Sequence, residues 1–151
     1  VGPHLDKLQP MSGVTVRDCR GLVIAPGLVD MRVFVGEPGE EHRETFRTAG
    51  EAAASGGITG LVCQPNTSPP LDDGPSIDFV KRRAQDRCIV RVHPMAALTK
   101  GCDGKEMTEF GLLKEAGAIA YTDGAKALTN PQVLRRALSY GRMFNALVVQ
   151  H

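Results

Sequence analysis

Strand-like and helix-like segments alternate along this chain, and the alternation constrains its fold more than any other feature. The expected strands span residues 28–35, 58–64, 88–97, 118–121 and 146–150. The expected helices lie between them, at residues 41–55, 74–86, 107–116 and 131–144. Strands and helices that alternate at this spacing are joined by right-handed crossovers and form parallel sheets. The pattern therefore predicts an α/β fold, built either as a doubly wound sheet or as a (β/α) barrel.

The turn after the first expected strand separates these two architectures. A doubly wound nucleotide-binding fold usually carries a G-x-G-x-x-G turn there, whereas this chain has Gly36-Glu37-Pro38-Gly39. Pro38 has no backbone N–H to offer a phosphate. The sequence thus favours a partial (β/α)8 TIM barrel over residues 26–151, with about five of the eight strands that a closed barrel needs. We therefore expect a part of a longer natural chain, lacking residues at both ends.

Residues 1–25 differ from the alternating pattern that follows them. Two short β-type segments, at residues 14–18 and 22–24, flank the polar stretch around Cys19 and Arg20. We interpret residues 1–25 as the remnant of a small N-terminal β-subdomain that packs beside the barrel.

The composition is that of an ordinary globular protein. Apolar residues make up 42% and charged residues 23% of the 151 positions, and the net charge is +1. No basic stripe and no apolar run near 18 residues is present, so we expect neither a nucleic-acid partner nor a membrane span. The four cysteines form no C-x-x-C pair, which favours free thiols and a reduced, cytoplasmic location.

Several short phrases, in this order and spacing, resemble the first half of dihydroorotase, a member of the amidohydrolase superfamily. The phrases are Ala25-Pro26-Gly27-Leu28-Val29-Asp30, Gly36-Glu37-Pro38-Gly39, Glu44-Thr45, Ala53-Ala54-Ser55-Gly56-Gly57-Ile58-Thr59, Pro65-Asn66-Thr67 with Pro69, and Tyr121-Thr122-Asp123-Gly124. The resemblance implies a metal-bearing (β/α)8 barrel that interconverts carbamoyl-aspartate and dihydroorotate. Its metal, usually zinc, would activate a water at the carboxyl ends of the strands.

The chain departs from the family pattern at the end of the first expected strand. The family has H-x-H after P-G-x-x-D, and this chain has Arg32 and Phe34 in those two places. Phe34 has no donor atom, and Arg32 keeps its positive charge and would repel a cation. Alternate residues of a strand face the same side, so both side chains should point into the barrel mouth, the same way as Asp30. Gly36 replaces the arginine that the family uses against the substrate carboxylate.

Three other positions match functional residues of the family. Asn66 corresponds to a substrate-contacting asparagine, although an asparagine there could equally be a turn residue that bonds its own backbone. Asp123 lies where the family carries a metal-bridging residue, and we favour an Asp-Gly turn for it. His151 matches a metal histidine, but one imidazole is a poor site by itself.

Two functional hypotheses follow, and they differ on whether the protein is an enzyme. The first is a non-catalytic dihydroorotase homologue that binds no zinc, forms homo-oligomers and supports aspartate carbamoyltransferase. The second is an active cyclic amide hydrolase with a reorganised or single-metal site that uses Asp123 and His151, with Arg32 as a substrate anchor. A hydantoinase or allantoinase relative is less favoured, because those enzymes also carry H-x-H.

The 151-residue piece is expected not to be a self-sufficient monomer. Inward residues such as Val33, Val62 and Val90 would lack packing from the missing strands, at about 25 cal/mol per Å² of apolar surface. A few hundred Å² would offset most of a stability of about 5–15 kcal/mol. Sedimentation at low micromolar concentration should show self-association. A compact monomer with a cooperative thermal transition would show instead that the half-barrel is a stable unit.

Overall fold

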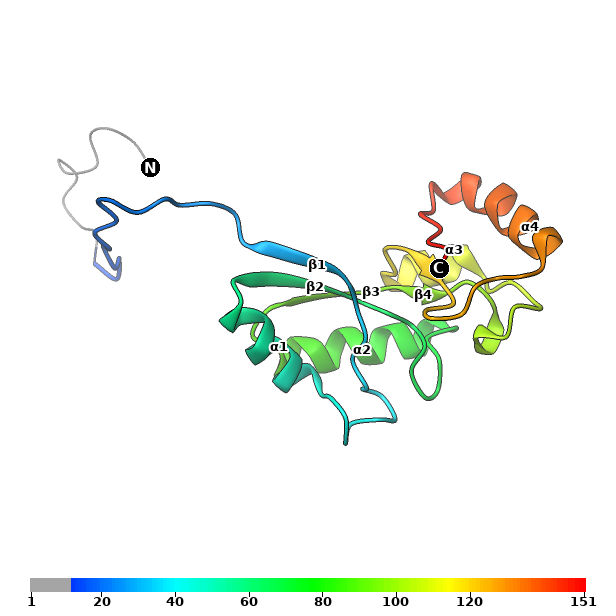
Figure 1. Cartoon of the computed structure of the whole chain (residues 1–151), viewed down its shortest axis with the longest axis horizontal. Helices are drawn as coiled ribbons and strands as arrows, with labels where there is room; N and C mark the ends of the chain where they lie inside the picture. Colours follow the sequence, from blue (N-terminus) through cyan, green and yellow to red (C-terminus); the bar gives the residue numbers. More distant parts are fainter. Residues whose placement is uncertain (1–11) are drawn as a thin grey trace.

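Two small parallel sheets organise residues 12–151, which are the residues described by this computed structural model (Figure 1). One sheet has the order β1-β2-β3, and the other pairs β4 with β5. The strands are β1 (Leu28–Val33), β2 (Ile58–Cys63), β3 (Arg91–Pro94), β4 (Ala96–Ala97) and β5 (Tyr121–Thr122). All of the strand pairs are parallel. The α/β class with parallel pairing is therefore confirmed.

The strands of the two sheets lie next to one another in chain order. We call each strand position a lane: β1, β2, β3 continued by β4, β5, and the segment at Val148. Met95 alone separates β3 from β4, and its N–H donates to the carbonyl of Cys63 in β2 at 2.9 Å. Beyond β5, a parallel bridge joins Tyr121 to Val148. A doubly wound sheet reverses its strand order at a switch point, whereas no reversal occurs within residues 12–151. The sequential order supports the barrel alternative, and closure of the barrel remains a prediction.

Four α-helices connect the lanes, and none in the described part of the chain is long and apolar enough to cross a membrane. They are α1 (Phe46–Ser55), α2 (Gly74–Arg87), α3 (Phe110–Ala116) and α4 (Pro131–Gly141). Short 3-10 turns, η2 (Lys100–Cys102) and η3 (Arg142–Phe144), follow β4 and α4. The α2 prediction is confirmed almost to the residue, since Asp73 caps its start by accepting from the N–H of Ser76 at 2.8 Å.

Several expected segments are shorter in the structure than in the prediction, or are absent from it. The first helix begins at Phe46 rather than at residue 41, because Thr45 and Thr48 form a reciprocal capping box. The expected strand at residues 146–150 is reduced to its single bridge at Val148. The β segments predicted at 14–18 and 22–24 form no strand in the described residues.

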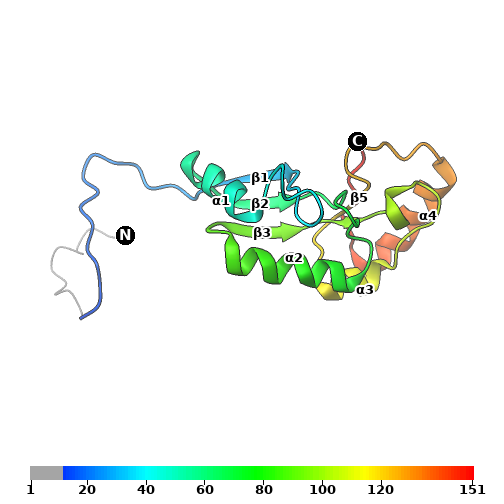
Figure 2. The same ribbon diagram turned by 90° about the horizontal axis from the view of Figure 1, so that it is seen from below.

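The N-terminal stretch runs away from the sheets (Figures 1 and 2). Val23 is 95% exposed there, because no neighbouring strand supplies a ladder for its backbone. Residues 1–11 of the expected β-subdomain lie outside the described residues. The division into residues 1–25 and 26–151 therefore stays a prediction.

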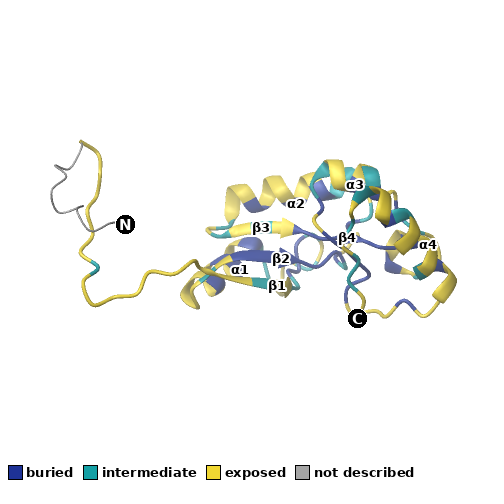
Figure 3. Ribbon diagram, turned by 90° about the horizontal axis from the view of Figure 1, so that it is seen from above, coloured by how far each residue is buried: buried dark blue, intermediate teal, exposed yellow. Residues whose placement is uncertain are grey.

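The sheets have two faces that carry different cores. The larger core lies between the strands and the helices, and α1 and α2 lie on the same side of the first sheet (Figure 1). Its strand residues include Leu61, Cys63, Ala96 and Tyr121, and Leu98 joins them just after β4. A smaller cluster covers the opposite face and comprises Val62, Met95 and Ala120, with Val149 packed against them. Within the three-stranded sheet, burial is deepest along β2, whose residues Gly60 to Cys63 are all buried (Figure 3).

Tyr121 connects the sheet to α3 at the centre of the larger core. Its ring stacks on Phe110 at 4.1 Å between centroids, and its hydroxyl donates to the carbonyl of Phe110 at 2.7 Å. Tyr121→Phe should remove this buried hydrogen bond and lower the free energy of unfolding by about 0.5–1.5 kcal/mol. Tyr140→Phe is the matched control, because its hydroxyl makes only an exposed 3.5 Å contact with Glu109. Urea unfolding of the full-length protein measures both, and equal losses would contradict the assignment.

Candidate functional site

The carboxyl ends of the lanes place one layer of side chains above the smaller core. In a strand, residues two apart face the same side. The residues two positions beyond Val62, Met95, Ala120 and Val149 are Gln64, Ala97, Thr122 and His151, and we call these four the mouth layer. The ladder continues to this level, because Gln64 N–H donates to the carbonyl of Val33 at 2.9 Å. Leu98 N–H likewise donates to the carbonyl of Thr122 at 3.1 Å.

Arg32 joins the mouth layer from the end of β1. Val33 and Val35 pack into the helix-side core, so Arg32 and Phe34 lie on the opposite face. The expectation for Asp30 is wrong: Asp30 pairs with Leu61 and Val33 with Cys63, so β1 holds one extra residue between the two pairs. Leu61 and Cys63 both belong to the helix-side core, and this bulge therefore places Asp30 in the helix-side register.

The guanidinium of Arg32 bridges two other lanes. Its Nη2 donates to the carbonyl of Gly124 at 3.3 Å and lies 2.6 Å from Nδ1 of His151. Because an arginine can only donate, Nδ1 must accept, and the proton of the neutral imidazole is then on Nε2. Within residues 12–151, no carboxylate lies in ion-pair distance of this guanidinium. Arg32 therefore places an unneutralised positive charge at the mouth.

Asp123 is buried next to this site, but its carboxylate faces Thr99. Oδ1 accepts from the Thr99 N–H at 2.8 Å, and Oδ2 accepts from the Thr99 hydroxyl at 2.6 Å. Gly124 follows with a φ of +68°, as the predicted Asp-Gly turn requires. Both oxygens therefore hold the segment after β4 against the segment after β5. A metal at Asp123 would compete with Thr99 for them.

Asn66 packs against the same turn. A Cβ at Gly124 would overlap the side chain of Asn66, so the turn needs glycine for its space as well as for its φ. The Oδ1 atom of Asn66 is buried and has no hydrogen-bond partner among the described residues. The turn interpretation expected this side chain to bond its own backbone, and the oxygen makes no such bond. The Nε2 atom of Gln64, a residue that is 8% exposed, is likewise buried and has no hydrogen-bond partner among the described residues.

Sequence reasoning did not single out Gln64. The signal that could have found it is its position two residues after Val62, at the end of a buried strand, where an apolar side chain would be ordinary. The structure therefore gathers Arg32, Asn66 and His151 around Gly124, with Gln64 in the adjoining lane.

The other motif residues serve the scaffold. A Cβ at Gly36 would overlap the carbonyl oxygen of Glu40, so an arginine at this place would displace the turn. Glu37 is 2% exposed, accepts the N–H of Phe46 at 3.0 Å, and pairs with Arg83. The guanidinium of Arg43 lies over the ring of Phe34, with its Cζ atom 5.1 Å from the ring centroid.

The two buried cysteines, Cys63 and Cys102, offer neither a nucleophile nor a metal-ligating thiolate at neutral pH. All four are free. Burial raises the pKa of the Cys102 thiol to about 12, and the carboxylate of Asp123 acts in the same direction. Burial likewise raises the pKa of Cys63 to about 12. Both thiols therefore stay protonated and behave as small apolar side chains.

A zinc ion does not fit the mouth as these residues are arranged. The Nδ1 lone pair of His151 accepts from Arg32, the oxygens of Asp123 are bonded to Thr99, and Phe34 has no donor atom. Among residues 12–151, no three His, Cys, Asp or Glu side chains cluster as metal ligands. Arg32 is the main reason. Its positive guanidinium lies beside His151, where a metal ion would need a ligand with a lone pair.

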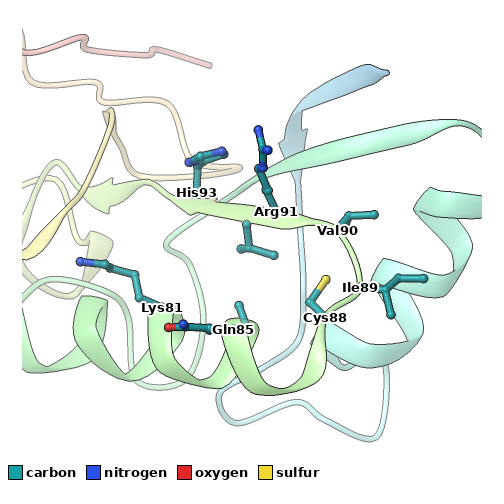
Figure 4. A pocket seen from close by; sticks show the side chains of 9 residues that line it. Lys81, Gln85, Cys88, Ile89, Val90, Arg91 and His93 are labelled. Atoms are coloured by element: carbon teal, nitrogen blue, oxygen red, sulfur yellow. The ribbon is translucent and has the colours of Figure 1, made fainter. Parts of the chain in front are cut away.

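A separate pocket of about 440 Å³ opens between α2 and β3 (Figure 4). Lys81 and Gln85 line it from α2, Cys88 from the end of that helix, and Arg91 and His93 from β3. Figure 4 shows that Arg91 and His93 extend from the side of β3 opposite to α2. The side chains of this pocket do not converge on a common centre, so the mouth is the stronger candidate site.

Comparison with known proteins gives two kinds of likeness. The family model for dihydro-orotase-like proteins matches residues 21–151. The dihydroorotase of Caldanaerobacter subterraneus subsp. tengcongensis is 40% identical over 147 residues, which cover 97% of this chain and 34% of that protein. The dihydroorotase of Pelotomaculum thermopropionicum is 44% identical over 140 residues, covering 93% of this chain and 33% of that protein. The chain thus spans about a third of the length of these relatives.

A solved structure shares the fold at lower sequence identity. L-hydantoinase (dihydropyrimidinase) from Arthrobacter aurescens aligns with a TM-score of 0.71 and 22% identity, over 83% of this chain and 29% of that one. This likeness supports an α/β fold with parallel strands for the aligned part of the chain.

Asp123→Asn tests the structural role of the buried carboxylate. The amide would turn an N–H₂ donor toward one of the two Thr99 donors, at a cost of about 1–3 kcal/mol in the free energy of unfolding. Asp78→Asn on the exposed face of α2 is the control and should stay within about 0.5 kcal/mol of the unaltered protein. An Asp123→Asn protein of unchanged stability that had lost a bound metal would place Asp123 in a metal site.

Proposed function

This chain belongs to the dihydro-orotase-like family, and from that membership we propose that it is a dihydroorotase-like protein of pyrimidine biosynthesis that has lost metal-dependent catalysis and acts as a scaffold. The observation that carries the proposal is the contact between Arg32 and His151. In this contact, His151, which matches a metal histidine of the family, bonds to the positively charged side chain of Arg32.

The electrostatics of this contact oppose metal binding. A metal-ligating histidine must be neutral and must present a lone pair. His151 presents Nδ1 to Arg32, and in this tautomer its other nitrogen carries the proton. A zinc ion at the same place would meet the guanidinium charge without an intervening carboxylate. Arg32 does more than remove a ligand, because it also repels the ion that the ligand held.

The preserved scaffold supports a structural role for the family fold. Glu37, Thr45 and Gly39 all belong to family phrases, and each stabilises the β1–α1 connection without touching the mouth. Selective change at Arg32 and Phe34 leaves this framework intact. We propose aspartate carbamoyltransferase as the partner, and self-association into homo-oligomers, on the strength of the family resemblance. Co-sedimentation of the two full-length proteins tests the pairing.

The alternative is a hydrolase with a reorganised single-metal site. Its support is the unpaired charge of Arg32, which could anchor a substrate carboxylate, together with the unpartnered Oδ1 of Asn66. It would need Asp123 and His151 to exchange their present partners for a metal, with further ligands from outside this chain. The contacts with Thr99 and Arg32 favour the scaffold role.

The purified full-length protein should carry far less than one zinc per chain and should not hydrolyse dihydroorotate above the rate of the buffer. The reason is the charge of Arg32 and the missing donor at Phe34. Elemental analysis and a hydrolysis assay measure both, with a family member that keeps H-x-H purified in parallel as the positive control. About one zinc per chain that is lost in His151→Ala, together with activity, would establish the alternative instead.

A further inference from the structure

We propose that the cleft between α1 and α2 is a binding site for a phosphate group, held by the guanidinium groups of Arg47, Arg83 and Arg87. The cleft lies on the helix side of the first sheet, whereas the mouth lies on the opposite face. The proposal therefore goes beyond the proposed function and does not depend on whether the mouth holds a metal.

The cleft has a volume of about 360 Å³, and the residues that line it are Glu37, Thr45, Arg47, Arg83 and Arg87. Glu37 belongs to the connection between β1 and α1, which runs down the helix side of the sheet in Figure 1. Thr45 and Arg47 lie at the start of α1, and the other two arginines lie one turn apart near the end of α2. Because α1 packs directly against α2, every wall of the cleft comes from described residues.

Most of the guanidinium donors in the cleft are free. Nε of Arg83 donates to Glu37, and neither Nη atom of Arg83 bonds to another residue within 12–151. Arg47 and Arg87 are exposed and form no ion pair or side-chain hydrogen bond with a described residue. Three like charges that line one cleft repel one another, and Arg83 and Arg87 do so at the i, i+4 spacing that destabilises a helix. A bound anion would offset this repulsion, and this is the physical reason for assigning an anionic ligand.

Glu37 orients Arg83 without blocking the cleft. Its side chain is 3% exposed, its Oε2 accepts the Phe46 N–H at 3.0 Å, and its Oε1 accepts from Arg83. The bond to Glu37 is also the largest cause of the raised pKa of Arg83, with smaller effects from Glu41 and Asp86. Glu41 and Asp86 do not line the cleft, so its lining carries three positive charges and one negative charge.

This arrangement suits a phosphate group better than a carboxylate. One guanidinium can bind both oxygens of a carboxylate, so a single arginine is enough for that group. A phosphate ester carries nearly two negative charges and three acceptor oxygens at neutral pH, and it can accept from several guanidinium groups at once. The first turn of α1 adds a backbone donor, because the N–H of Arg47 has no partner within residues 12–151. A free N–H at a helix N-terminus favours phosphate as well.

Isothermal titration of the full-length protein with phosphate, phenyl phosphate and succinate, at constant ionic strength, tests the site. The first two probes represent the free ion and an ester, and succinate carries two negative charges without the tetrahedral group. We expect saturable binding of at least one of the two phosphates, with a dissociation constant below about 1 mM, and about tenfold weaker binding of succinate. Binding of phenyl phosphate would identify an esterified ligand, and binding of the inorganic ion alone would identify free phosphate.

Arg47→Met and Arg87→Met assign the binding to the cleft. Each should weaken phosphate binding by about tenfold or more, and both proteins should fold, since neither side chain has a polar partner among the described residues. Arg82→Met on α2 and Arg135→Met on α4 remove the same charge outside the cleft and should bind as the unaltered protein does. Arg83 is left unchanged, because its loss would leave a buried carboxylate without its charge partner.

Three results would overturn the proposal: no saturable binding of either phosphate, equal binding of succinate, or cleft variants that bind no more weakly than their controls. Thermal unfolding gives a second measurement, in which phosphate should raise the Tm of Arg82→Met more than that of Arg87→Met. Metal content and hydrolysis enter none of these measurements. A zinc-bearing, active protein that binds phosphate in the cleft would therefore refute the proposed function alone, and a zinc-free, inactive protein that binds none would refute this site alone.

Discussion

Parallel pairing of neighbouring lanes in chain order is the constraint on which the rest of this structure depends. It brings the carboxyl ends of β1, β2, β4 and β5 to one edge, and it sorts alternate residues onto two faces. The face toward the helices is filled by the larger apolar core, while the opposite face carries Val62, Met95, Ala120 and Val149. The residues discussed at the mouth lie two residues beyond that smaller cluster, near the end of β1, or in the loops that follow β2 and β5.

The motifs that identify the family mix two kinds of residue, and the structure separates them. Glu37 accepts the first N–H of α1 and pairs with α2 through Arg83, and a Cβ at Gly39 would overlap the backbone of Ser68. These positions are required by the connection between β1 and α1, whatever the mouth contains. Arg32 and Phe34 meet no such requirement. A chain can therefore keep the fold of a family while residues at the mouth differ, and fold alone does not fix function.

Most of the fold could be predicted from the sequence, but less of the site could. The alternation predicted the α/β class and a helix at residues 74–86, where α2 lies. Local propensity could not show that strands at residues 14–24 lack a ladder partner in the described chain, because pairing is a tertiary property. Nor could period-two reasoning foresee the bulge that places Asp30 in the helix-side register. Gln64 escaped notice because an unpartnered amide is visible only when its surroundings are known.

The identity of the residue at position 32 decides how the mouth should be understood. A small apolar residue there would have left His151 and the carbonyl of Gly124 open to any cation. Arginine instead spans from β1 to both groups and satisfies them with its own charge. Because that charge cannot be removed by proton loss at physiological pH, the mouth has become a permanent site of positive potential. This permanent charge is the physical basis of the proposed loss of metal binding.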